Sequence, residues 1–156
     1  MQSTAIPPVR KSIEVATAPA NAFRIFTSDM HRWWPTCGHD HGRETIVLEP
    51  RAGGRWFERV KGGEEHPWGH VIEWAPPDRV VLAWQKDMES KFDPSLVTEV
   101  EIRFQPAAAG RTLVSVEHRK LERYGVRAEE AVKLYESPNA WVGVLEALRA
   151  AAGSPS

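Results

Sequence analysis

The hydrophobic and polar positions of this chain first alternate as in a strand and then repeat as in a helix. Val9, Ile13 and Val15 share one side of a segment whose other side is polar, which predicts a half-buried strand. A helix is predicted from Pro19, with apolar residues at three- and four-residue spacings. It ends before Pro35, because the residue preceding a proline avoids helical geometry.

Strand-like segments make up the middle of the chain. They cover residues 45–49, 55–60, 68–74, 80–85, 96–104 and 112–118. Clusters of Gly, Pro and Asp separate them, as in hairpins. The separations are too short for crossover helices, so we expect one antiparallel sheet of about seven strands, including the first strand.

The last part of the chain is helical in pattern. A short helix is possible over residues 128–135, and Ser137-Pro138 has the composition of a helix start. This start opens a helix over about residues 139–152. Its apolar stripe consists of Trp141, Val144, Leu145 and Leu148. An antiparallel sheet has one face that must be covered, so this helix is predicted to cover it in an α+β fold.

The composition is that of one globular domain and excludes several classes of function. The chain has 156 residues, 20 basic and 21 acidic side chains, a net charge of −1 and one cysteine. This balance gives no support for nucleic-acid binding, and no apolar run is long enough to span a membrane. With neither a secretory signal nor an internal disulfide, we expect a cytoplasmic protein. Its single domain is predicted over residues 9–152, with loose termini at 1–8 and 153–156.

Four stretches of the chain carry a family likeness. They are APANAFRIFTSDMHRWWP (18–35), EPRAGGR (49–55), WGHV (68–71) and WAPPDRVVLAW (74–84). In this order and spacing they resemble the START-like (SRPBCC) helix-grip superfamily, most of all its bacterial branch related to activators of the heat-shock chaperone ATPase. The resemblance covers about residues 9–152. It implies a Bet v-like curved sheet wrapped around a long C-terminal helix, with a deep cavity that binds or transforms apolar small molecules.

Period-two alternation assigns the tryptophans of the predicted sheet to faces. Trp68, His70, Ile72 and Trp74 share one face of their segment. A five-residue loop at 75–79 would pair Trp74 with Val80, Ile72 with Leu82, and His70 with Trp84. The same alternation places Val100 and Ile102 on this face, which is therefore predicted to be apolar and rich in indole rings.

The segment 55–60 has two possible registers. A three-residue loop after Lys61 would place Trp56 opposite His70 and Glu58 opposite Trp68. A two-residue Gly62-Gly63 turn would invert the pairing, because a slip of one residue changes the face of every side chain. We prefer the first register, since it keeps Trp56 with the other aromatic residues.

In that register Glu58 and His70 stand inside an apolar face. Burial raises the pKa of a carboxyl group, whereas a protonated imidazole beside it would lower it. Such a pair could be a satisfied structural contact, could orient a polar group of a ligand, or could act as acid and base. The sequence leaves these three interpretations open.

We therefore predict an enclosed pocket for an apolar or aromatic small molecule between the sheet and the C-terminal helix. The predicted ligand-binding residues are Trp34, Trp56, Glu58, Trp68, His70, Trp84, Val100, Ile102, Trp141 and Leu145. One alternative is a cyclase- or hydrolase-type enzyme that uses the same cavity, with catalytic residues unknown. Another is a protein-interaction module related to chaperone ATPase activators. No cofactor, nucleic acid or membrane partner is predicted, and a homodimer is possible.

One loop contains the residue types of a metal site. It is Cys37-Gly38-His39-Asp40-His41, which could be a polar loop, a metal site or a Cys–His nucleophilic pair. Zinc sites usually draw ligands from two separated pairs, and neighbours so close along a chain rarely reach the geometry that activates a nucleophile. We therefore predict a polar loop and no metal.

Overall fold

In residues 6–35, 43–89 and 91–153, the parts of the chain that the computed structural model describes, seven strands form one antiparallel sheet. The strands are β1 (Val9–Val15), β2 (Arg43–Leu48), β3 (Arg55–Val60), β4 (Glu65–Ala75), β5 (Arg79–Trp84), β6 (Thr98–Pro106) and β7 (Thr112–Arg119). Their order across the sheet is β1-β7-β6-β5-β4-β3-β2, with every neighbouring pair antiparallel. This confirms the predicted antiparallel sheet of about seven strands.

The helices lie in two groups along the sequence. They are α1 (Pro19–Ser28), α2 (Met30–Trp33), the 3-10 helix η1 (Leu121–Arg127), α3 (Ala128–Glu136), the π-helical turn η2 (Pro138–Val142) and α4 (Gly143–Gly153). The predicted first helix is thus two helices, which meet at Asp29. No described helix is long and apolar enough to cross a membrane.

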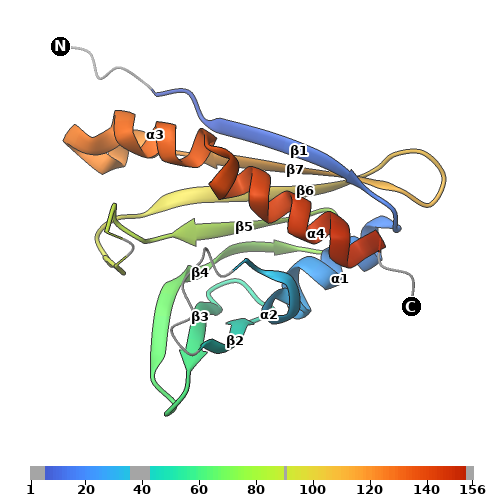
Figure 1. The fold of residues 1–156 in the computed structure, drawn as a ribbon, viewed down its shortest axis with the longest axis horizontal. Coiled ribbons are helices and arrows are strands. Elements are labelled where there is room, and N and C mark those ends of the chain that lie inside the picture. The colour runs from blue at the N-terminus through green and yellow to red at the C-terminus, as the bar shows by residue number, and fades with distance from the viewer. Residues whose placement is uncertain (1–5, 36–42, 90, 154–156) are drawn as a thin grey trace.

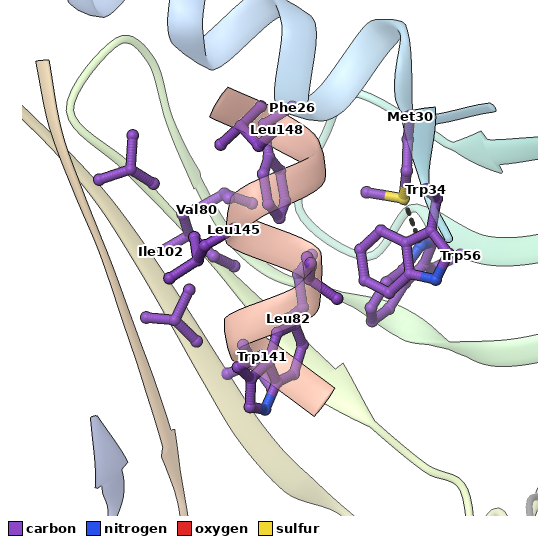
Figure 2. Close-up of a cluster of buried hydrophobic side chains, with 14 of the residues drawn as sticks. Phe26, Met30, Trp34, Trp56, Val80, Leu82, Ile102, Trp141, Leu145 and Leu148 are labelled. Carbon is purple, nitrogen blue, oxygen red and sulfur yellow. Dashed lines mark hydrogen bonds between the residues drawn. The ribbon is translucent and has the colours of Figure 1, made fainter. Parts of the chain in front are cut away.

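The helices cover one face of a curled sheet. Figure 1 shows α3 and α4 along this inner face, with α1 beside the C-terminal part of α4, while β2 and β3 curl away from β1 and β7. The core fills the space between these layers. Phe26 of α1, Ile102 of β6, and Leu145 and Leu148 of α4 are fully or almost fully buried in one continuous apolar cluster (Figure 2). The predicted α+β helix-grip architecture is confirmed.

The outer face of the sheet is held by ion pairs. The carboxylate of Glu101 on β6 lies 2.6 Å from Arg119, 2.8 Å from Arg103 and 3.3 Å from Arg79. Burial alone would raise the pKa of Glu101, but the hydrogen bond from Arg119 and the three guanidinium charges lower it. The apolar and aromatic residues are therefore concentrated on the inner face.

A β-bulge in β4 changes the predicted face of His70 and Ile72. Trp74 pairs with Val80 as predicted, but the register shifts between Val71 and Glu73. Val71, not Ile72, therefore faces Leu82, and Gly69, not His70, faces Trp84. Strict alternation failed because a bulge adds one residue to the strand and reverses the faces of the residues before it. Ile72 is accordingly exposed and Val71 buried.

The pairing of β3 with β4 also differs from the prediction. Trp56 lies opposite Gly69, and Glu58 lies opposite His66. A second register shift, after Trp56, accounts for part of the difference. The rest comes from the turn, where Val60 already bonds to Glu64.

Gly69 marks a point where β4 and β5 approach each other closely. A Cβ atom on Gly69 would lie 1.7 Å from the carbonyl oxygen of Ala83. Real Cβ atoms do not come so close to an oxygen, and both groups are backbone-fixed. Only glycine fits here, and it leaves room for the ring of Trp56, 3.7 Å from the same Cβ position.

Replacing Gly69 by alanine should therefore destabilise the fold. We expect Gly69→Ala to lower the free energy of unfolding by about 2 kcal/mol or more, because the strands must separate to admit the methyl group. Gly153→Ala is the matched control, since nothing lies within 4 Å of its Cβ position. Urea denaturation measures both. Equal midpoints for the two variants would contradict the close approach of β4 to β5.

Candidate ligand-binding site

Five tryptophans meet on the inner face of the sheet and are called here the indole cluster. They are Trp34 at the end of α2, Trp56 on β3, Trp68 on β4, Trp84 on β5 and Trp141 on η2. Their ring centroids lie 5.4 to 6.3 Å apart in seven pairs, the separation of favourable aromatic contacts. Four of the rings are buried and Trp84 is half-buried. Indole rings in contact thus stand where the sequence predicted a pocket wall.

Most of the cluster's ring N–H groups bond to side chains. Nε1 of Trp56 donates to Sδ of Met30 at 3.2 Å, a bond drawn in Figure 2, and Nε1 of Trp68 donates to Oε1 of Glu58 at 3.1 Å. Buried indole N–H groups need such acceptors, because they have lost water. Glu58 is buried and, as predicted, shares the inner face with Trp56.

His118 accepts the ring N–H of Trp141. This histidine on β7 is fully buried, and Nε1 of Trp141 lies 3.1 Å from its Nδ1. Its Nε2 lies 2.8 Å from Oγ1 of Thr98, and that hydroxyl donates to the carbonyl oxygen of Trp84 at 2.9 Å. Burial lowers the pKa of His118 to about 3. The imidazole is therefore neutral, with Nδ1 as acceptor and its hydrogen on Nε2.

A second chain of hydrogen bonds runs from Trp84 toward the surface. Nε1 of Trp84 donates to the hydroxyl of Tyr135, which lies 2.9 Å from the hydroxyl of Tyr124. Tyr124 in turn donates to the carbonyl oxygen of Lys86 at 2.7 Å. Tyr124 has one hydrogen, so Tyr135 donates to it. Burial raises the pKa of both phenols, which stay protonated and tie η1 and α3 to β5.

The edge of the cluster carries a positive charge. Nζ of the half-buried Lys86 lies 4.5 Å from the ring centroid of Trp68 and 5.8 Å from that of Trp84. A surface depression of about 250 Å³ lies beside this edge, lined in part by Met88, Leu96 and Tyr124. Tyr124 therefore links the depression to the chain that ends at Trp84.

His70 does not join the cluster, which corrects the predicted pairing with Glu58. It lies opposite Arg55 and Ala83 in the ladders, on the outer face, and its Nδ1 is 2.8 Å from Oε1 of Gln85. The bulge in β4 is the reason. Val100, Ile102 and Leu145 are buried in the core as predicted, while Cys37–His41 lie outside the described residues.

Sequence reasoning did not assign His118, Tyr124 or Tyr135 to the site. Alternation did place Thr98 and His118 on the inner face, and that was the available signal for His118. Nothing in the local sequence marked Tyr124, which lies on a 3-10 helix, or the bond from Tyr135 to Trp84.

The neutral state of His118 should be visible in the pH dependence of stability. The unfolded chain binds a proton at His118 below about pH 6.5, whereas the folded chain does not do so until about pH 3. The free energy of unfolding should therefore fall as the pH drops below 6.5, with His118 contributing up to about 1.4 kcal/mol per pH unit. Carboxylates with lowered pKa, such as Glu101, add their loss only below about pH 4.5.

Urea denaturation between pH 6.5 and 5 tests this origin. His118→Gln should flatten the slope, because no group at this position then takes up a proton on unfolding. His66→Gln, at an exposed histidine, should leave the slope near that of the wild type. An unchanged slope in His118→Gln would mean that His118 is protonated in the folded state.

Comparisons with known proteins agree with this geometry. The sequence model of the family described as "Activator of Hsp90 ATPase homolog 1-like protein" matches residues 16–153. Among solved structures, an anthrahydroquino-gamma-pyrone synthase, Txn09, is 36% identical, covering 86% of this chain and 90% of that one, with a TM-score of 0.60. Curated protein sequences give no match.

A second structure matches at nearly full length. The self-sacrificing resistance protein CalC from Micromonospora echinospora is 26% identical, covering 96% of this chain and 98% of that one, with a TM-score of 0.69. CalU16 from the same organism is 18% identical, covers 96% of this chain and 76% of that one, and has a TM-score of 0.62, which shows likeness of fold alone. By the match over residues 16–153, the chain belongs to the Activator of Hsp90 ATPase homolog 1-like family and has its START-like helix-grip fold.

Proposed function

We propose that this protein binds a planar aromatic small molecule at the indole cluster, and that the molecule takes the place of the Trp141 side chain. One observation carries the proposal. Trp141 enters the cluster from a helical turn whose geometry is broken at the residue before it. The ring that closes the cluster is thus carried by the least regular part of the helical cover.

The break lies at Ala140, between α3 and α4. Its φ of −106° and ψ of −120° lie outside the helical and extended regions. Sparsely populated backbone conformations and π-helical turns concentrate at functional sites. A rotation at Ala140 moves Trp141 without unwinding α4, which begins at Gly143. The cover therefore has a hinge beside the ring that must leave.

An aromatic ligand can replace the contacts that Trp141 makes. The Trp141 ring lies 6.1 Å from Trp34 and 5.7 Å from Trp84, both edge to face. A planar ring system in the same position keeps these contacts and buries comparable apolar surface. Exchange of one ring for another is thus close to balanced in free energy, and a larger ring system gains by burying more.

The relatives support a ligand-binding or cyclase-type function. The 36% identical structure is named as a synthase of an anthrahydroquino-gamma-pyrone, a fused aromatic ring system. A ligand of that chemical class is flat and matches the indole faces of the cluster. The family membership, the aromatic inner face and the broken turn at Ala140 therefore favour the same kind of ligand.

Nuclear magnetic resonance can observe ligand entry directly through the indole N–H signals. Adding 2-naphthol, whose ring system is about the size of indole, should shift the signals of Trp141 and Trp84. The signal of Trp33 is the internal control, because its Nε1 donates to the carbonyl oxygen of Ile25 on α1. Cluster signals that do not move at saturating naphthol would contradict the proposal.

Removing Trp141 should strengthen binding. In Trp141→Ala the internal competitor is gone, so we expect 2-naphthol to bind about tenfold more tightly or better. Leu148→Ala is the control, since it also opens a cavity at a fully buried position of α4. Calorimetry measures both affinities. A similar gain in the two variants would indicate non-specific cavity filling.

The name of the synthase also favours a second candidate, in which the protein transforms the molecule that it binds. Glu58 would then be the acid or base, because it is the buried carboxylate that contacts the cluster. His118 is a poor base, since burial lowers its pKa to about 3.

Glu58→Gln tests this candidate, because the amide oxygen can still accept the N–H of Trp68. Native mass spectrometry of protein purified from its own host identifies the retained molecule, and chromatography follows its conversion. For an enzyme we expect conversion to stop while affinity stays within about twofold. If affinity and conversion fell together, Glu58 would be a binding residue.

A further inference from the structure

We infer that the ligand carries an N–H or O–H donor, which bonds to Nδ1 of His118 in place of the indole N–H of Trp141. This inference rests on the proposed function and specifies its ligand. In the structure, Nε1 of Trp141 lies 3.1 Å from Nδ1 of His118. Trp141 thus acts as an internal stand-in for the ligand, both in its aromatic faces and in its one polar group.

The hydrogen-bond chain fixes Nδ1 of His118 as an acceptor. The carbonyl oxygen of Trp84 can only accept, so the Thr98 hydroxyl spends its single hydrogen there. Thr98 must therefore accept from Nε2 of His118, at 2.8 Å. Nε2 carries the hydrogen, and Nδ1 has only its lone pair to offer.

Protonation does not reverse this assignment. His118 is fully buried, and burial lowers its pKa to about 3. The rings around it are those of Trp84, Tyr135 and Trp141, with centroids 6.2, 4.4 and 5.8 Å away. None of these neighbours carries a negative charge that would stabilise an imidazolium. Nδ1 is therefore an acceptor across the physiological pH range.

The departure of Trp141 leaves this acceptor without its donor. Met30, Glu58 and Tyr135 keep the N–H groups of the other cluster rings. A ligand with a phenol or ring N–H restores the bond at His118, whereas a ligand without a donor leaves a buried acceptor unsatisfied. That loss corresponds to at least about a tenfold difference in affinity. The site thus selects hydroxylated or N–H aromatics over hydrocarbons of the same shape.

A matched pair of probes tests the selection. 2-Naphthol and 2-methylnaphthalene have nearly the same shape, and the methyl group is the more hydrophobic of the two substituents. Hydrophobicity alone therefore favours 2-methylnaphthalene, whereas the bond to His118 favours 2-naphthol by about tenfold or more. Calorimetry on the wild-type chain gives both affinities, so the test does not depend on a variant that folds.

Two variants locate the acceptor. His118→Asn places an amide oxygen near the position of Nδ1 and should keep the preference for 2-naphthol. His118→Leu removes the acceptor and should abolish it. Equal binding of both probes to the wild type would overturn the inference and leave the proposed function intact. A preference that persists in His118→Leu would also overturn it. If neither probe binds the wild type, the proposed function itself fails, and the inference with it.

Discussion

The buried indole N–H groups impose the constraint on which the rest of this structure depends. Each has left water and costs free energy unless an acceptor meets it in a fixed direction. The acceptors are side chains from different elements, namely Met30 of α2, Glu58 of β3, His118 of β7 and Tyr135 of α3. Ring stacking alone would allow these elements to slide, whereas directional bonds fix α2, α3 and β7 against the middle of the sheet.

The same constraint separates the two faces of the sheet. On the outer face charged groups satisfy one another close to water, as Glu101 does with three arginines. On the inner face the polar groups are neutral or neutralised by a single bond, and burial lowers the pKa of His118 and raises the pKa of Tyr135. Donors and acceptors there keep fixed roles. The direction of each bond can therefore be deduced, and it gives the aromatic face its specificity.

The sequence predicted the regular part of this fold and missed the irregular part for a physical reason. Alternation is unbroken in the pairing of β6 with β7, and there the faces of Val100, Ile102 and His118 followed from the pattern. It failed in β4, because the bulge depends on how closely Gly69 approaches Ala83, a contact between strands that no local pattern encodes. His70 was assigned to the site for this reason and lies outside it.

The partners of the aromatic rings were equally out of reach of the sequence. The pattern placed Trp141 on the last helix, but not the bond to His118 that orients it, because the two residues stand on different elements and meet only in the folded chain. The break at Ala140 was also missed, since Ser137-Pro138 is a normal helix start and alanine favours helix. Tertiary contacts to the cluster override that preference.

Trp141 competes with any ligand for the cluster, and that competition constrains what the ligand can be. A side chain tethered to the chain acts at an effective concentration of millimolar or more, so a free molecule that made only the same contacts would lose at ordinary concentrations. A successful ligand must bury more surface than one indole while still supplying the donor for His118. The edge where Lys86 lies over Trp68 and Trp84 offers that additional surface, since an aromatic system extending there meets two indole faces and a cation. The architecture therefore favours polycyclic aromatics over single rings, with the internal tryptophan setting the minimum size.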